Sequence, residues 1–214
     1  DLSMQTLNNI PSHQSLTLDY EDADLIWENT EMPIDPIFKE ISKTSIIGNT
    51  RHEENSYNDF LFEGLTFKML STDGPRMLTG DVNGDELEDV ILLGAADDMN
   101  KLFLQQKDGK LISRAVKGFT FDKHLEATCG AIFDFDQDGD NDILFGHGGN
   151  EIQKGRENFG LRLYENDGGG NFSINIQATP QVRGNFSCIV PGDIDNDGDM
   201  DLFIGARSVP GNYG

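Results

Sequence analysis

The sequence predicts an all-β protein, namely a partial β-propeller of about three four-stranded blades that follows an irregular N-terminal segment. Three acidic windows recur at residues 81–89, 134–142 and 193–201, with starts 53 and 59 residues apart. An apolar segment precedes each window and a strand-forming run containing Gly follows it. No helical period extends over three turns between the windows. This recurrence is typical of repeat proteins, and about four strands in roughly 55 residues match one propeller blade.

Each repeat reads as a strand, an acidic loop, a second strand and an outer hairpin. The strands before the loops lie in RMLTG, AIF and CIVPG, and those after them in DVILLGA, DILFGHG and DLFIGAR. The outer hairpins are LFLQQKDGKLISRAV, with an Asp-Gly turn, and LRLYENDGGGNFSINI, with an Asp-Gly-Gly-Gly turn. Such turns between runs of strand formers are strong hairpin signals.

The first part of the chain differs from the repeats, and we expect boundaries at 1–20, 21–36 and 37–214. One strand is expected at Ser15–Leu18. Residues 21–36 are acidic and contain Pro, as a linker would, with Ile26 and Trp27 as anchors. Residues 36–49 fit either an edge strand or a short helix, and the pattern does not decide between them.

Charge and hydropathy exclude several classes of function. The net charge is −22, and 15 of the 38 acidic residues lie in the three windows. Nucleic acids and anionic membranes attract clustered Lys and Arg, so we expect neither as a partner, and three bound calcium ions would still leave −16. The longest nearly apolar stretch covers about seven residues, too few for membrane insertion. The acidic windows instead favour cations.

The windows have the spacing D-x-[DN]-x-D-[GE]-x-x-D, which predicts calcium sites. Oxygen donors at alternate positions of a tight loop can converge on one cation, and calcium takes six to eight oxygens. We expect side-chain ligands from positions 1, 3, 5 and 9 and a backbone carbonyl from position 7. The ligand sets are Asp81, Asn83, Asp85, Leu87 and Asp89; Asp134, Asp136, Asp138, Asp140 and Asp142; and Asp193, Asp195, Asp197, Asp199 and Asp201.

An EF-hand is the main alternative, and the sequence argues against it. An EF-hand needs an acidic residue at position 12 and flanking helices. Position 12 is Leu92, Phe145 or Ile204, and the flanks read as strands. Gly139 and Gly198 at position 6 suit a left-handed turn. The first loop has Glu86 there, which costs about 1–2 kcal/mol if the turn is left-handed, so two to three calcium ions are expected.

We expect the ions to stabilise the fold and not to act in catalysis. Five acids in one loop repel each other without a cation. The acid clusters belong to the loop pattern and no nucleophile motif is present, so the sequence predicts no enzyme. Scattered histidines such as His52 and His147 are expected to form hydrogen bonds and not to bind a metal.

The two cysteines occupy equivalent positions in successive repeats. Cys129 and Cys188 each lie five residues before an acidic window. Equivalent positions on neighbouring blades are often too far apart for a disulfide, except near the axis. The sequence leaves two alternatives open for this pair: a disulfide, or two buried free thiols.

Several strings resemble the FG-GAP/VCBS repeats of integrin-α-type propellers, and more closely the bacterial VCBS proteins with ASPIC/UnbV domains. They are HEENSYNDF with MLSTDGPRMLTGDVNGD, then GGNE, then GNFSCIVPGDIDNDGDMDLFIGARSVPGNYG, within residues 37–214. LNNIPSHQSLTLDYEDA resembles the closing strand of an ASPIC/UnbV domain, which would make residues 1–20 its tail. Glu86 departs from the Gly usual in the family.

The resemblance implies an extracytoplasmic protein, secreted or on the outer-membrane surface. Propellers close with four to eight blades, so we expect an internal fragment whose partners include the remaining blades or domains of the parent chain. We expect a non-catalytic, calcium-binding module that binds a protein or glycan. Alternatives are a structural spacer or subunit of an outer-membrane assembly and, less favoured, a propeller-based hydrolase or lyase. An exposed aromatic patch would favour binding over a spacer role.

Overall fold

A computed structural model of the chain describes residues 3–23, 25–26, 37–150 and 160–208. Two compact units, Asp1–Glu40 and Ile41–Gly214, divide the chain. The elements are β1 (Ser3–Met4), η1 (Tyr20–Asp22), β2 (Leu25–Ile26), α1 (Ser42–Ser45), β3 (Ile46–Ile47), η2 (Asp59–Leu61), β4 (Met77–Gly80), β5 (Asp89–Leu92), β6 (Lys101–Gln105), β7 (Leu111–Arg114), η3 (Lys117–Thr120), β8 (Glu126–Phe133), β9 (Asp142–Gly148), β10 (Leu161–Asn166), β11 (Phe172–Asn175), β12 (Asn185–Gly192) and β13 (Asp201–Ser208).

The first unit is small and holds one antiparallel pair, β1 with β2, in which Met4 lies opposite Leu25. The 3₁₀ turn η1 begins after Asp19, whose carboxylate accepts the N–H of Glu21 at 3.1 Å. The strand expected at Ser15–Leu18 is wrong: residues 15–18 are exposed and form no strand in the described chain. A short apolar pattern cannot form a strand without a partner. The start of the expected linker forms part of η1 and the strand β2, in which Ile26 pairs with Ser3. Trp27 and residues 28–36 lie outside the described residues, and the boundaries at residues 20 and 36 stay a prediction.

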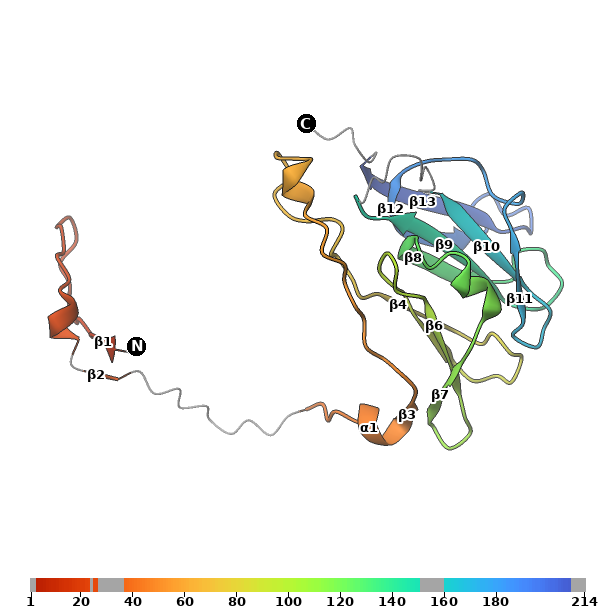
Figure 1. The fold of residues 1–214 in the computed structure, drawn as a ribbon, viewed down its shortest axis with the longest axis horizontal. Coiled ribbons are helices and arrows are strands. Elements are labelled where there is room, and N and C mark those ends of the chain that lie inside the picture. The colour runs from red at the N-terminus through yellow and green to blue at the C-terminus, as the bar shows by residue number, and fades with distance from the viewer. Residues whose placement is uncertain (1–2, 24, 27–36, 151–159, 209–214) are drawn as a thin grey trace. The chain divides into compact units, whose positions relative to one another are not determined.

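The second unit contains three antiparallel arrangements of strands in chain order (Figure 1). The first sheet is ordered β4-β5-β6-β7, the second β8-β9-β10-β11, and the third is the pair β12-β13. β8 contacts both β4 and β12, so the first strands of the three sheets are neighbours. This order, with the first strand innermost and each sheet against the next, is that of consecutive propeller blades. The predicted all-β fold is confirmed.

For residues 36–49 the sequence left an edge strand and a short helix as alternatives, and the N-terminal part of this unit contains both. The short helix α1 leads directly into β3, which pairs in parallel with the outermost strand β7, Ile46 opposite Leu111. The first sheet therefore has a fifth strand that the repeat pattern did not predict. Within the described residues, no helix is long and apolar enough to span a membrane.

Hydrophobic side chains pack between successive sheets. Residues 143–145 of β9 show how: Ile143 and Phe145 belong to the cluster shared with the first sheet, whereas Leu144 belongs to the cluster shared with the third. Because neighbouring side chains on a strand point to opposite faces, the second sheet is buried on both sides. Phe119, Phe145 and Tyr164 meet edge to face within the first cluster, with ring centroids 5.3–5.6 Å apart.

Candidate metal centre in three acidic loops

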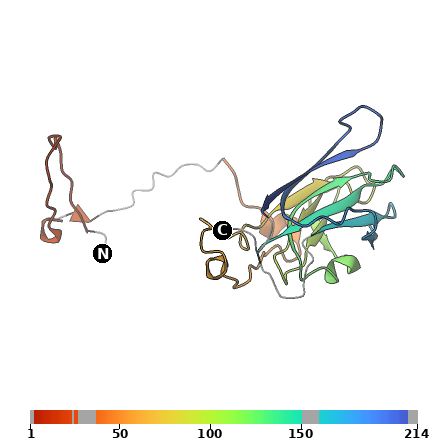
Figure 2. The ribbon, with the colours of Figure 1, turned by 90° about the horizontal axis from the view of Figure 1, so that it is seen from above.

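The three acidic loops occupy the same structural position in their sheets. Each joins the first strand of a sheet to the second, β4 to β5, β8 to β9 and β12 to β13. The residue before the loop always pairs with the aspartate at position 9: Gly80 with Asp89, Phe133 with Asp142 and Gly192 with Asp201. Because the pairing is identical, each window of nine residues closes the same turn. In Figure 2 the third loop, in blue, projects from the body of the unit.

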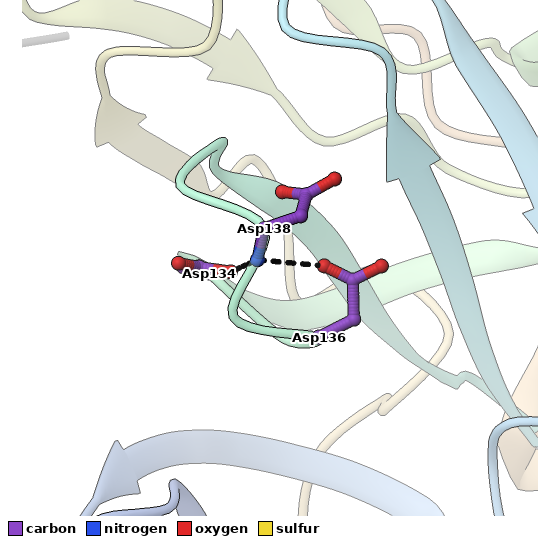
Figure 3. A group of neighbouring side chains, drawn as sticks. All are labelled: Asp134, Asp136 and Asp138. Carbon is purple, nitrogen blue, oxygen red and sulfur yellow. Dashed lines mark hydrogen bonds between the residues drawn. The ribbon is translucent and has the colours of Figure 1, made fainter.

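The second loop gathers its first three aspartates around one point (Figure 3). Asp134 accepts the backbone N–H groups of Asp138 and Gly139, both at 3.1 Å, and Asp136 accepts that of Asp138 at 3.3 Å. One carboxylate oxygen from each of the three aspartates lies within 4.8 Å of the other two. These hydrogen bonds fold the loop so that three carboxylates converge, as a calcium site requires.

The other two loops repeat this arrangement. In the third loop, Asp193, Asp195 and Asp197 converge in the same way, within 4.8 Å. In the first, the Asp81 carboxylate accepts N–H groups from four residues, including Asp85 at 3.3 Å and Glu86 at 2.7 Å. Asn83 Oδ1 accepts the N–H of Asp85 at 3.1 Å, and Asn83 donates to the Asp85 carboxylate at 3.3 Å. Positions 1, 3 and 5 are therefore together in every loop.

Backbone angles confirm the predicted left-handed turn at position 6, where φ is +63° at Glu86, +98° at Gly139 and +95° at Gly198. Position 4 is left-handed as well, with φ of +63° at Gln137 and +61° at Asn196. Sequence reasoning missed this second turn. The available signals were Gly84 at position 4 of the first loop and Asn196 at position 4 of the third, because Gly and Asn both tolerate the left-handed region. The first loop thus has Gly at position 4 and a strained Glu at position 6, the reverse of the other two.

The aspartate at position 9 links each loop to the sheet. Asp89 accepts the N–H groups of Val82 at 3.1 Å and of Gln105, on β6, at 2.8 Å. Asp142 does the same with Phe135 at 3.0 Å and with Asn166, on β10, at 2.8 Å. Carboxylate oxygens have further lone pairs for a metal, so the role of position 9 as a ligand stays a prediction.

The position-7 aspartate of the second loop faces a neighbouring turn. A Cβ placed on Gly168 would lie 2.5 Å from an oxygen of Asp140, so this carboxylate lies beside the turn of the β10–β11 hairpin. This orientation agrees with the expectation that Asp140 offers a cation its carbonyl and not its side chain. Ligation by the position-7 carbonyl stays a prediction for Leu87, Asp140 and Asp199 alike.

Electrostatics differ between the loops. Burial raises the pKa of the Asp81 carboxyl, but backbone N–H donors, above all that of Glu86, outweigh it and hold the pKa below its usual value. In the second loop, desolvation and the charges of neighbouring aspartates, first Asp138, raise the pKa of Asp140. In the third loop, the charge of Asp197 raises the pKa of Asp199. Crowded negative charge in the second and third loops would be relieved by a cation.

The loops also contact one another. The amide of Asn141 donates to the backbone carbonyl of Asp81 at 2.8 Å, which joins the second loop to the first. Gln137 donates to the carbonyl of Gly198 at 3.4 Å, which joins the second loop to the third. The three candidate centres therefore form one cluster at one end of the three sheets.

Cysteine and histidine side chains lie outside this cluster. Cys129 and Cys188 are both free thiols, Cys129 buried and Cys188 half-buried. His52 Nδ1 lies 3.1 Å from the carbonyl of Leu93, and His147 Nδ1 lies 2.9 Å from that of Gly160. The expectation that these histidines form hydrogen bonds is confirmed, although His147 lies on a buried strand and not in a loop.

Comparison with known proteins agrees with the repeat geometry. A family described as FG-GAP-like repeat matches the chain twice, at residues 81–145 and 134–204. Each match begins at the first aspartate of an acidic loop and ends in the strand that follows the next acidic loop, β9 or β13. No curated protein matches the chain. Because the two matches together cover more than half of the sequence, the chain belongs to the FG-GAP-like repeat family.

Proposed function

We propose that this chain is a calcium-stabilised propeller module, extracellular or on the cell surface, that binds a protein partner and does not catalyse a reaction. The observation that carries the proposal is the convergence of the carboxylate oxygens at positions 1, 3 and 5 in the second and third loops, together with the hydrogen bonds that join the same three positions in the first loop. FG-GAP repeats are typical of extracellular and cell-surface binding modules, which supports the location and the non-catalytic role.

Calcium would act as a structural ion in these loops. The carboxylates at positions 1, 3 and 5 converge near the loop backbone, and each loop connects the two innermost strands of its sheet. Extracellular modules bind calcium with dissociation constants of about 10⁻⁴–10⁻³ M. At millimolar calcium each site would add roughly 1 kcal/mol to the free energy of unfolding. Calcium would thus hold each pair of inner strands together.

An exposed apolar segment favours a protein partner over a spacer role. We call residues 60–67, which include η2, the apolar segment. Its exposed members are Phe60, Leu61, Phe62, Leu65 and Phe67, and Phe67 is 87% exposed. The Phe62 ring stacks on Tyr57 with centroids 5.3 Å apart, so part of this surface is held in place. Large apolar side chains gathered on one segment mark interaction sites, and they suit a protein better than a glycan.

Calorimetric titration of calcium into the chelator-stripped chain tests the metal part of the proposal. We expect three sites, the first weaker because Asn83 gives it one ligand charge fewer than the other two, together with a higher melting temperature in calcium. A variant with Asp134→Asn and Asp136→Asn should lose one site. The matched control, Asp19→Asn with Asp22→Asn, removes the same charge from the first unit and should keep all three. Absence of binding at millimolar calcium would refute the metal sites.

Site-specific photo-crosslinking on the producing cells tests the partner. A crosslinking amino acid at Phe67 should capture one defined protein, whereas the same group at Ile194, an exposed apolar residue of the third loop, should not. Capture of glycan at Phe67 would assign the surface to carbohydrate. Absence of any product specific to Phe67 would support the alternative of a structural spacer or a subunit of an outer-membrane assembly.

A further inference from the structure

The third sheet has a strand edge that no other strand of the described chain covers. In the first two sheets the second strand lies between two neighbours, β5 between β4 and β6, and β9 between β8 and β10. The third sheet is the pair β12-β13 alone, so one edge of β13 has no neighbouring strand among the described residues. β13 is eight residues long and contains neither Pro nor Lys, the residues that commonly protect an exposed edge. Such an edge can accept an added strand.

The aspartates at position 9 show what a third strand supplies in the other two sheets. One oxygen of Asp89 accepts an N–H of its own loop, and the other accepts the N–H of Gln105 on β6. Asp142 makes the same two bonds, with Asn166 on β10 as the strand donor. In the third loop, Oδ2 of Asp201 accepts an N–H of its own loop at 2.9 Å, and its Oδ1 accepts none from the described residues. This carboxylate is therefore placed to receive the N–H of a third strand.

Apolar side chains beside this edge are exposed, whereas their counterparts are buried. Phe203 on β13 pairs with Val190 on β12, and the two are 61% and 56% exposed. The matching pair in the second sheet is Leu144 with Ala131, and both are buried. Leu163 of the third strand lies opposite Leu144 and belongs to the same hydrophobic cluster. A strand with Leu at this position would therefore cover part of Phe203.

The third strands of the first two sheets share a sequence pattern. Residues 102–105 read Leu-Phe-Leu-Gln and residues 163–166 read Leu-Tyr-Glu-Asn. In both, the Leu lies opposite an apolar residue of the second strand, the aromatic side chain is buried, and the last residue donates its N–H to the position-9 aspartate. Leu-aromatic-any-Gln/Asn occurs nowhere else in residues 1–214. A third such strand must therefore come from another polypeptide.

We propose that the open edge of β13 binds an extended segment of a partner polypeptide as an antiparallel third strand, and that this segment has the pattern Leu-aromatic-any-Gln/Asn. The backbone N–H of the Gln or Asn donates to Oδ1 of Asp201. The Leu lies beside Phe203 and the aromatic side chain beside Leu202, as in the second sheet. Backbone pairing supplies affinity, and the two apolar side chains supply selectivity.

This edge is a different surface from the apolar segment at residues 60–67. It also excludes the side chain of Ile194, because the counterparts Val82 and Phe135 pack in the clusters between sheets and not along a strand edge. Loss of binding at one surface therefore leaves the other untouched, and the calcium stoichiometry is measured separately from both.

Titration of a strand peptide into the ¹⁵N-labelled full chain, in millimolar calcium, tests the proposal. The probe is an acetylated, amidated peptide with the sequence of residues 160–166, GLRLYEN, which has no net charge. We expect saturable amide shifts along β13, with half-saturation below about 1 mM. Hydrogen exchange of alternate β13 amides, Leu202 and Ile204 among them, should slow, because hydrogen-bonding groups alternate between the two edges of a strand.

Two methylated peptides distinguish strand pairing from other contacts. On β10 the N–H of Asn166 points to Asp142, whereas that of Asp167 points to the opposite side, to the carbonyl of Asn171 at 3.2 Å. N-methylation at the Asn166 position should weaken binding about tenfold or more, because it removes a hydrogen bond to an ionised group. N-methylation at the Glu165 position, whose N–H faces away from β13, should change little.

Analytical ultracentrifugation and hydrogen exchange of the chain alone complete the experiment. We expect a monomer in which the Leu202 and Ile204 amides exchange fast. Slow exchange in a dimer would give the edge to a second copy, and slow exchange in a monomer would mean that the chain covers its own edge; either result would overturn the proposal. Equal binding of the two methylated peptides, or no saturable shift by about 2 mM of the unmodified peptide, would also overturn it.

Discussion

At the scale of single residues, the loop backbone explains what differs between the three candidate sites. Each loop needs two left-handed residues, at positions 4 and 6, and no loop has Gly at both. A residue with a Cβ costs about 1–2 kcal/mol in that region, although Asn tolerates it better. The first loop places this cost on Glu86, the second on Gln137 and the third on Asn196.

Replacing Glu86 by Gly should therefore stabilise the chain. We expect Glu86→Gly to raise the free energy of unfolding by about 1 kcal/mol in calcium-free buffer, because it removes the strain of a left-handed Glu. Urea denaturation followed by circular dichroism measures this. Glu88→Gly is the matched control: it removes the same charge from the same loop at a position whose φ is not left-handed, and it should destabilise. Equal effects of the two variants would show that charge, and not backbone strain, decides.

The thiol of Cys129 should be inert in the folded chain. Burial raises its pKa to about 12, so very little thiolate exists near neutral pH. We expect iodoacetamide at pH 8 to modify Cys188, which is half-buried, well before Cys129. Mass spectrometry of tryptic peptides gives the ratio, and both cysteines should react equally in urea. Rapid modification of Cys129 in the folded chain would contradict the burial of this strand.

His147 should make the chain less stable in mild acid. Burial lowers the pKa of its imidazole to about 4, below the ordinary 6.5, so the unfolded state binds the proton more readily. Stability from this group is present above pH 6.5 and is lost as the pH falls towards 4, by about 2 kcal/mol between pH 6.5 and 5.

Denaturation curves across that pH range, in calcium-free buffer, test the role of His147. His147→Asn retains a donor for the Gly160 carbonyl and removes the titrating ring, so its stability should fall less steeply with acid. His13→Asn, at an exposed histidine of the first unit, should keep the wild-type slope. A wild-type slope in His147→Asn would mean that other groups cause the acid sensitivity.

At the scale of elements, each acidic loop is a turn whose side chains divide between two tasks. Positions 1, 3 and 5 converge, whereas position 9 ties the loop to the sheet and Asp140 at position 7 lies beside the next hairpin. We expect Asp138→Asn to weaken calcium binding of the second loop about tenfold, because it removes a ligand charge. Asp140→Asn removes the same charge but keeps the carbonyl, so its affinity should change little. Calorimetry compares the two, and equal losses would mean that net loop charge, and not ligand geometry, sets the affinity.

The sequence predicted the strands and turns of the repeats, where the residue pattern is periodic. It failed where strand formation depends on pairing with a segment that is distant in the chain. The strands beside each acidic window and the Asp-Gly turn at Gly109 follow from local chemistry, and the structure confirms them. A strand at Ser15–Leu18 was wrong, and the pairing of β3 with β7 was not foreseen, because both depend on contacts distant in sequence. Left-handed Gln137 was missed because Gln has no preference for that region, whereas Asn196 is a residue that tolerates it and was overlooked.

At the scale of the whole molecule, the second unit consists of three successive sheets whose first strands, β4, β8 and β12, are neighbours. The aspartate at position 9 links each of the first two loops to the third strand of its sheet, and Asn141 and Gln137 link the loops to each other. Loss of calcium would therefore affect neighbouring sheets together. A small polar cavity lined by Asp73, Glu126 and Arg207 lies at the other ends of these strands, so the acidic loops and this cavity are at opposite ends of the module.

The most direct test is a crystal structure of the chain grown in millimolar calcium, with anomalous differences collected to locate the ions. We expect one peak in each loop, about 2.3–2.6 Å from the side-chain oxygens of positions 1, 3 and 5, from the position-7 carbonyl and from the position-9 carboxylate. A weaker peak beside Asp81, where position 3 is the neutral Asn83, fits this expectation. Three loops without anomalous density at that concentration would contradict it, and the recurring aspartates would then serve only to fold the turns.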